Sequence, residues 1–206
     1  MSDLIKRILS SIILLPLVIY FTLMGSFYLI FLITICFTVS FFEWYKMVKK
    51  INYKISGFFF LIFSFFSFYD LAINNIVLIP FLICISTDIG GYIFGNIFKG
   101  PKLTKISPNK TYAGMIGGFF SSILIISLYF NYIDFPLTIT WFLTIILISS
   151  VSQTGDIIVS YFKRLSKIKN TGNIIPGHGG LLDRIDGMIF AFPIFYLFEL
   201  TDYLVL

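Results

Sequence analysis

Long apolar runs recur along the whole sequence, and they constrain its fold more than any other feature. Several windows approach the roughly 20 apolar residues that an α-helix needs to cross the hydrocarbon core of a bilayer. Only 12% of the residues are charged and 58% are hydrophobic, whereas soluble domains carry roughly 25% charged residues. A soluble fold of this composition would expose large apolar patches to water. The sequence therefore predicts an all-α, polytopic transmembrane bundle, with residues 1–206 forming a single domain.

The hydropathy pattern predicts seven membrane spans. The N-terminal apolar run has a basic flank, as a signal peptide does. It is longer than a signal-peptide core of about 7–15 residues, and no small-residue cleavage site follows it, so we interpret it as an uncleaved first span. The third span is short enough to be a tilted or partly buried helix. The seven predicted ranges are about 8–24, 27–45, 56–69, 74–98, 112–131, 137–161 and 185–205.

The positive charges predict the orientation of these spans. If the N-terminus is cytoplasmic, the segments 1–7, 46–55, 99–111 and 162–184 face the inside and hold all 15 Lys and Arg residues. This segregation follows the positive-inside rule and indicates a multi-pass protein of the cytoplasmic (inner) membrane. The net charge of +5 is then an orientation signal that also attracts anionic headgroups. We expect no nucleic-acid partner.

Polar residues inside apolar spans are costly to bury, so each is a candidate functional residue. Asp88 lies in the fourth span among glycines that permit close helix approach; it is either a polar helix-packing residue or a metal ligand. Lys110 precedes a helix that Thr111 could cap, and a helix N-terminus is a favourable place for phosphate. The alternative for Lys110 is a basic loop that only sets the topology.

The end of the sixth span carries a polar face. Asp156, Ser160 and Lys163 are spaced i, i+4 and i+7, so they share one side of a helix, and Lys167 would continue this stripe by one turn. Arg164 stands beside them at the predicted interface. A carboxylate below a pair of cations is what a site for a metal and a nucleotide needs. The alternative is an aspartate neutralised by Lys163 within a basic flank.

The stretch IIPGHGGLLDRIDG, residues 174–187, collects glycines and charges in an otherwise apolar chain. Its three leading glycines can fold sharply and present backbone N–H groups to an anion. Asp183 and Asp186 are spaced i, i+3 and face one way if a helix has begun there. Arg184 suits a phosphate or a partner carboxylate. His178 is the only histidine, so a turn or hydrogen-bonding role is favoured over a His-rich metal site.

Four aspartates and four cations thus gather near the predicted cytoplasmic face. Carboxylate oxygens suit Mg²⁺, and Mg²⁺ between carboxylates and phosphates is typical of phosphoryl or nucleotidyl transfer. Neither a G-x-S-x-G elbow nor a P-loop occurs in the sequence. The acids are Asp88, Asp156, Asp183 and Asp186, and the cations are Lys110, Lys163, Arg164 and Arg184.

The run SYFKRLSKIKNTGNIIPGHGGLLDRID, residues 160–186, resembles the signature of the phosphatidate cytidylyltransferases, also called CDP-diacylglycerol synthases. The blocks FFEWYKM, STDIGGYIFG, SPNKTYAG and GDIIVS resemble other parts of that family, so the resemblance extends over most of the chain from Glu43 onward. Asn170 departs from the pattern, because the family has Asp there. The matching residues are Ser160, Lys163, Arg164, Lys169, Gly172, His178, Gly179, Gly180, Asp183, Arg184 and Asp186.

The resemblance implies a nucleotidyltransferase that moves the CMP moiety of CTP onto phosphatidate, with Mg²⁺ as cofactor. The products are CDP-diacylglycerol, for phospholipid biosynthesis, and pyrophosphate. By similarity, Asp156 and Asp183 are the first candidates for metal ligands, with Asp186 and Asp88 as further ones. The implied catalytic residues are Asp156, Asp183, Asp186, Lys163 and Ser160, and the implied substrate-binding residues are Arg164, Lys110, His178, Gly179, Gly180, Arg184 and Lys169.

Three other functions stay open at this point. Aspartates and glycine-broken helices within spans also suit a small membrane transporter, although the polar residues lie only in the cytoplasmic half. A CDP-alcohol phosphotransferase would need a wider-spaced run of acids that is absent from the sequence. Asn170 admits a catalytically impaired family member. Glycine-rich helices also suggest a homodimer.

Overall fold

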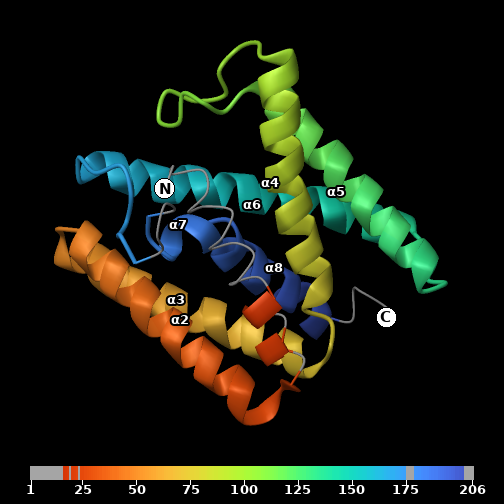
Figure 1. Cartoon of the computed structure of the whole chain (residues 1–206), viewed down its shortest axis with the longest axis horizontal. Helices are drawn as coiled ribbons and strands as arrows, with labels where there is room; N and C mark the ends of the chain where they lie inside the picture. Colours follow the sequence, from red (N-terminus) through yellow and green to blue (C-terminus); the bar gives the residue numbers. More distant parts are fainter. Residues whose placement is uncertain (1–15, 19, 23, 175–178, 202–206) are drawn as a thin grey trace. The chain divides into compact units, whose positions relative to one another are not determined.

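The structure is a computed structural model that describes residues 16–18, 20–22, 24–174 and 179–201. Within these ranges it is helical, and the only extended pairing is an isolated bridge between Lys102 and Thr111. The helices, labelled in Figure 1, are α2 (Ser26–Met47), α3 (Ile51–Ile73), α4 (Leu78–Phe98), α5 (Tyr112–Tyr132), α6 (Ile139–Leu165), α7 (Leu182–Ile185) and α8 (Met188–Leu200).

Five of these helices, α2 to α6, are long and apolar enough to cross a membrane. They correspond to the second to sixth predicted spans and confirm a multi-pass helical membrane protein. The first predicted span lies mostly outside the described residues, and α8 has only 13 residues where about 20 are needed. Seven spans and a cytoplasmic N-terminus therefore stay predictions.

The third predicted span differs most from the structure, because α3 has 23 residues rather than the short segment expected over 56–69. Five of the extra residues lie at its start, where Asn52 and Lys54 lower the hydropathy, and four lie at its end, where Asp70 does the same. The backbone becomes helical directly after Lys50, which is extended at φ −76° and ψ 133°. Polar side chains in a first turn hide a helix from a hydropathy window without preventing it from forming.

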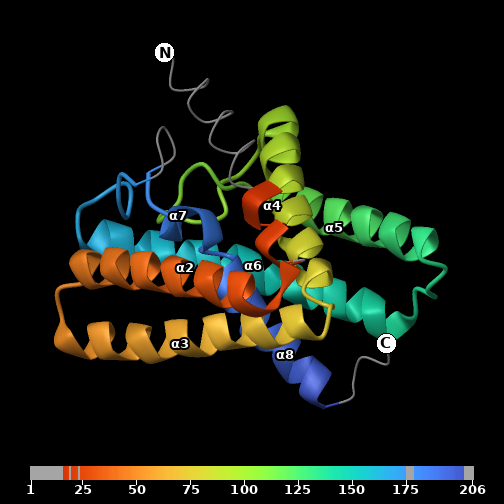
Figure 2. The ribbon, with the colours of Figure 1, turned by 60° about the horizontal axis from the view of Figure 1, so that its bottom comes forward.

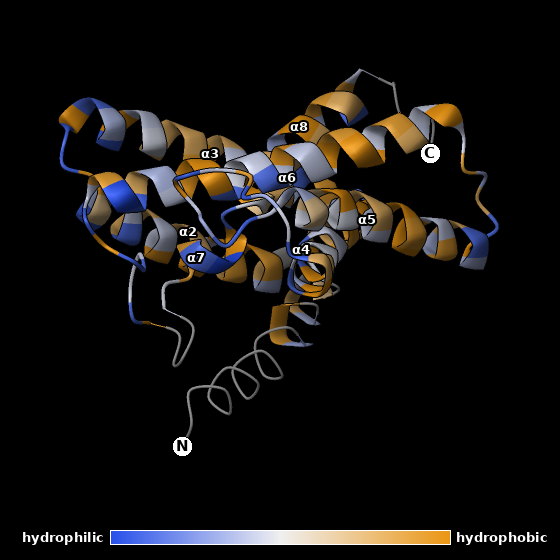
Figure 3. Ribbon diagram, turned by 90° about the horizontal axis from the view of Figure 1, so that it is seen from above, coloured by the Kyte–Doolittle hydropathy of each residue, from blue (hydrophilic) through white to orange (hydrophobic). Residues whose placement is uncertain are grey.

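The described residues fall into two compact units. Unit 1 comprises the described residues up to Asn75 and those between Phe162 and Ile185, and unit 2 comprises the described residues from Ile76 to Tyr161 and from Asp186 onward. Unit 1 thus holds α2, α3, α7 and the last residues of α6, whereas unit 2 holds α4, α5, α8 and the rest of α6. In Figure 3 the hydrophilic colour is clear at α7, while the long helices are mostly apolar.

In unit 1, α2 and α3 form an antiparallel hairpin that lies side by side in both ribbon views (Figures 1 and 2). Aromatic edges hold it together: the Phe41 and Phe58 rings meet at 5.1 Å between centroids, a favourable separation for an edge-to-face pair. The Trp44 indole donates to the Tyr53 carbonyl at 3.0 Å. Gly57 makes room for that indole, since a Cβ there would overlap its ring.

In unit 2, glycines bring the backbones of α4 and α5 into direct contact (Figure 1). A Cβ on Gly90 would lie 2.6 Å from the Gly117 carbonyl oxygen, and one on Gly114 would lie 2.7 Å from the Gly91 carbonyl oxygen. Small residues at helix interfaces allow this close approach in membranes, where packing replaces the hydrophobic effect as the driving force. The predicted role of these glycines in helix packing is consistent with this contact.

Substituting Gly114 with alanine should destabilise unit 2 by about 1–3 kcal/mol, the usual cost of overpacking. The new methyl group would collide with backbone, which cannot rotate away. The matched control is Gly91→Ala on the facing helix, whose Cβ would meet only the Gly114 oxygen, at an ordinary 3.6 Å. Denaturation midpoints of the two variants in one detergent test this, and equal midpoints would contradict the packing argument.

Candidate active site

Asp156 is the centre of a polar cluster in unit 2. One carboxylate oxygen, Oδ2, pairs with the Lys110 ammonium at 2.5 Å, and the other, Oδ1, accepts from the Ser160 hydroxyl at 3.3 Å. The side chains of Lys110 and Asp156 are 23% and 30% exposed. Lys110 also donates to the Gln153 carbonyl at 3.2 Å. The cluster therefore joins a cation and a carboxylate that are 46 positions apart in the chain, and both side chains stay partly exposed at the surface of the structure.

The segment before α5 brings Lys110 to that carboxylate. Leu103 donates its backbone N–H to the Lys110 carbonyl at 2.8 Å, and Tyr112 donates to the Pro101 carbonyl at 3.2 Å. Thr111 caps α5 by accepting from the Gly114 N–H at 3.1 Å, which confirms the predicted cap. Lys110 consequently stands immediately before the N-terminus of α5, where the helix dipole favours an anion.

Asp183 is the centre of a second cluster, in unit 1. Its Oδ1 atom pairs with the Lys163 ammonium at 2.8 Å, and the two side chains are only 8% and 10% exposed, respectively. Its Oδ2 atom accepts from the backbone N–H groups of Thr171 at 2.8 Å and Gly180 at 3.1 Å. Buried charges need such partners. Asp183 thus ties the end of α6 to both sides of the glycine-rich segment.

Glu43 is a third carboxylate of this region that sequence reasoning did not select as a site residue. It lies on α2, is 2% exposed, and accepts from Thr171, Leu181 and Leu182. The signal was available: an acid inside an apolar span is a functional candidate by its cost alone. It was missed because Glu43 stands near the span's end, where a charged residue is ordinary.

The remaining predicted residues have separate positions in the structure. Arg164 donates to the Ile168 carbonyl at 3.1 Å and so closes the C-terminus of α6. The prediction that Lys167 continues the helical stripe is wrong, because α6 ends at Leu165 and Lys167 has φ 56°. His178 lies outside the described residues. Among the predicted site residues, Asp88, Arg184 and Lys169 are exposed. Asp186 and Asp156 are half-buried.

The carboxylates differ in their suitability for a metal ion. No group of three or more His, Cys, Asp or Glu side chains comes together within the described ranges. Asp156 has one partner on each oxygen and is accessible, so it keeps lone pairs for a hard cation such as Mg²⁺. Asp183 has both lone pairs of Oδ2 engaged by backbone and is nearly buried. The donor chemistry fits Mg²⁺ better at Asp156 than at Asp183.

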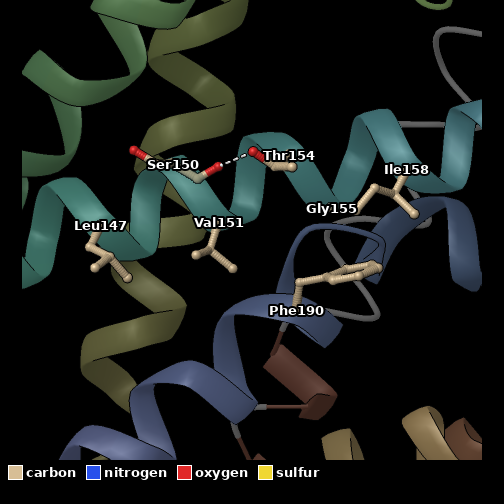
Figure 4. Close-up of a pocket in the computed structure, with 7 residues that line it drawn as sticks. All are labelled: Leu147, Ser150, Val151, Thr154, Gly155, Ile158 and Phe190. Carbon is tan, nitrogen blue, oxygen red and sulfur yellow. Dashed lines mark hydrogen bonds between the residues drawn. The ribbon is translucent and has the colours of Figure 1, made fainter.

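An open cavity of about 250 Å³ lies in unit 2 beside the Asp156 turn of α6. Figure 4 shows Leu147 and Val151 projecting from α6, and Phe190 of α8 lying near Gly155. The Thr154 hydroxyl donates to the Ser150 carbonyl at 2.8 Å, so its hydrogen is not available to a molecule in the cavity. The lining is therefore largely apolar, and two of its residues, Thr154 and Gly155, directly precede Asp156.

Comparison with known proteins places this geometry in a family. The model of the cytidylyltransferase family matches residues 74–201. The phosphatidate cytidylyltransferase of Rickettsia prowazekii is 39% identical over 167 residues, which cover 75% of this chain and 73% of the relative.

Two staphylococcal proteins with the same name are also similar. That of Staphylococcus haemolyticus is 42% identical over 120 residues, 57% of this chain and 46% of the relative. That of Staphylococcus aureus strain COL is 40% identical over 135 residues, 64% of this chain and 52% of the relative. The matched part thus spans about half the length of the staphylococcal relatives. The resemblance inferred from the signature is confirmed: the chain belongs to the cytidylyltransferase family.

Proposed function

We propose that this protein transfers the CMP moiety of CTP to phosphatidate and releases pyrophosphate. The observation that carries the proposal is the Lys163–Asp183 pair, because it joins two signature residues 20 positions apart and adds the Gly180 N–H to the same carboxylate. A cation, an acid and a glycine backbone so arranged suit the handling of phosphates. The names of the relatives supply the substrates.

For this reaction the protein must supply positive charge and align the two substrates. A phosphate oxygen of phosphatidate attacks the α-phosphorus of CTP; the new P–O bond forms as the bond to the β-phosphate oxygen breaks, and pyrophosphate leaves with the electron pair. The nucleophile is already an oxyanion, so no general base is required. The difficulty is to bring two anions together, which cations and positioning relieve.

Each side chain then has a role that its contacts support. Lys110 and Lys163 bind phosphate oxygens, with Arg164 beside Lys163 on α6. Asp156 would hold Mg²⁺, which when bound withdraws charge from the phosphates. Ser160 orients the Asp156 carboxylate through its hydrogen bond at 3.3 Å. Asp183, Asp186 and Asp88 remain further candidates for the metal, and His178, Gly179, Gly180, Arg184 and Lys169 for substrate contacts.

Both lysines proposed to bind phosphate are already paired with carboxylates in the structure. Each ammonium is neutralised by an aspartate, Lys110 by Asp156 and Lys163 by Asp183. A Mg²⁺–nucleotide brings both an anion for the lysine and a cation for the carboxylate, so the partners can exchange without leaving a charge unpaired. Such an exchange of partners is easier at the partly exposed Lys110–Asp156 pair than at the buried Lys163–Asp183 pair.

The two substrates would reach the site by different routes, the lipid from the bilayer and CTP from water. A lipid reaches a membrane enzyme sideways through the bilayer, and the apolar cavity beside Asp156 offers space for part of an acyl chain. CTP arrives from the cytosol, which requires the polar ends of these helices to face inward in the cytoplasmic membrane, with the N-terminus inside. Glycine-rich helices further favour a homodimer.

The direct test uses purified full-length protein in phosphatidate-containing vesicles with labelled CTP. We expect label in the lipid extract, loss of incorporation with a chelator and recovery with added Mg²⁺. The Asn170→Asp variant, assayed alongside, shows whether the departure from the family residue limits the rate. Folded protein that incorporates no label, in either form, would contradict the proposal. Ion-coupled uptake by the same vesicles would instead revive the transporter hypothesis, which the comparisons do not support.

A further inference from the structure

Glu43 has surroundings that packing alone does not explain. Its carboxylate is 2% exposed within a span of 21 apolar-rich residues, Phe27–Met47. It accepts from the Thr171 hydroxyl at 2.9 Å, the Leu181 N–H at 3.0 Å and the Leu182 N–H at 2.9 Å. A buried carboxylate is tolerated only with such donors, and an apolar residue would fill the same space without that requirement.

The three donors come from both sides of the glycine-rich segment, which connects this carboxylate to Asp183. Thr171 gives its hydroxyl to Glu43 and its backbone N–H to Asp183. Leu182, which donates to Glu43, directly precedes Asp183 in α7. Glu43 and Asp183 therefore hold the same few residues from two sides, and Asp183 in turn holds Lys163.

Two signature glycines fit this arrangement because the chain passes directly over Glu43. A Cβ on Gly172 would lie 2.6 Å from Oε1 of Glu43, and a Cβ on Gly180 would overlap Oε2 of Glu43 and the Thr171 hydroxyl. Any other residue type at either position would push the segment off the carboxylate. The close approach of the backbone, and not turn flexibility alone, thus accounts for glycine at 172 and 180.

We propose that Glu43 is a positioning residue, which sets the place of Asp183 and so keeps Lys163 aligned for the phosphate of the substrate. It acts through Thr171, Leu181 and Leu182 and touches no reacting atom itself. The kinetic part of this inference rests on the proposed function, whereas the structural part does not. The experiments below keep the two separate.

The first experiment measures Lys163 without any reference to activity. In Glu43→Gln one amide N–H₂ must face a backbone N–H donor, so the Leu181–Leu182 turn is released and the Lys163–Asp183 pair loosens. We expect an amine-reactive reagent, followed by mass spectrometry, to modify Lys163 several-fold faster than in the wild type. Lys110 in unit 2 should react at its wild-type rate. The control Asp70→Asn removes a carboxylate of the same unit that accepts from Asn74, and it should change neither lysine.

Unchanged labelling of Lys163 in folded Glu43→Gln would overturn the inference. If Lys110 also becomes reactive, the variant has unfolded, and the decisive pair is then Thr171→Val and Thr171→Ser. Both keep the backbone N–H that donates to Asp183, but only serine keeps the hydroxyl for Glu43. Faster labelling in the valine variant alone supports the inference, and equal labelling in both contradicts it.

The second experiment uses CTP incorporation per folded molecule. We expect Glu43→Gln to lower kcat/KM for CTP at least tenfold while the KM for phosphatidate stays within twofold, and Thr171→Ser to restore what Thr171→Val loses. A purely structural Glu43 would reduce the amount of folded protein and leave both KM values unchanged. If the wild type incorporates no CTP but Lys163 labelling responds as expected, the proposed function fails and the positioning role stands.

Discussion

Asp183→Asn is expected to lower CTP incorporation by about 100- to 1000-fold, the range seen when one preorganised electrostatic group is lost, and to destabilise the protein as well. The side chains of Asp183 and Lys163 are 8% and 10% exposed and stand 2.8 Å apart. Removing one partner of a buried pair leaves an uncompensated charge, which typically costs about 3–5 kcal/mol. Denaturation in detergent measures this, alongside the activity assay.

The geometry gives asparagine no good orientation at position 183. Its single oxygen can face either the Lys163 ammonium or the two backbone donors, Thr171 and Gly180. Its N–H₂ group would then point at the remaining donors. Both choices leave buried polar groups without acceptors, which adds to the cost of the lost charge.

A second substitution separates stability from activity. Asp183→Asn combined with Lys163→Met removes the unpaired ammonium and keeps the length of the buried side chain, so it should recover part of the stability lost in the single variant. Incorporation should stay at the level of Asp183→Asn, since the phosphate has lost its cation. Recovery of activity along with stability would show that the pair serves the fold alone.

Much of the fold followed from hydropathy, because a bilayer leaves few solutions for a chain of this composition. The ranges of α4 and α5 agree with the predicted spans at the end of α4, Phe98, and at the start of α5, Tyr112. The Thr111 cap was also readable, since capping depends only on neighbours in the sequence. Hydropathy did not predict the start of α3 at Ile51, because its first turn contains polar residues. Periodicity did not predict the end of α6, after which Lys167 has a positive φ.

The pairings of the site could not be predicted in the same way. The polar residues of α6 were evident from their spacing, but which cation neutralises which acid depends on the loop before α5 and on the segment after α6. Sequence periodicity placed Lys163 above Asp156; the structure pairs Lys163 with Asp183 and gives Asp156 to Lys110 instead. The contacts of Glu43 span the longest separation of all, 139 positions to Leu182.

Asp156→Asn is expected to give the opposite balance to Asp183→Asn, with a large loss of activity and little loss of stability. The Lys110–Asp156 side chains are 23% and 30% exposed, and an ion pair of this accessibility contributes about 0.2–1 kcal/mol. Asparagine keeps an oxygen that can accept from Lys110, and its N–H₂ group can donate to the Ser160 hydroxyl oxygen. It loses the negative charge that suits a divalent cation, so incorporation should fall about 100-fold or more and require more Mg²⁺.

The matched control for Asp156→Asn is Asp134→Asn in the same unit. Asp134 is exposed and has φ 53°, a conformation that asparagine adopts readily, so the substitution removes one carboxylate without strain. Incorporation and its Mg²⁺ dependence should match the wild type. If Asp156→Asn also kept wild-type activity and Mg²⁺ dependence, Asp156 would serve only to neutralise Lys110. The metal would then have to be held by acids outside this cluster, and Asp183, whose Oδ2 is fully engaged by backbone, would be a poor replacement.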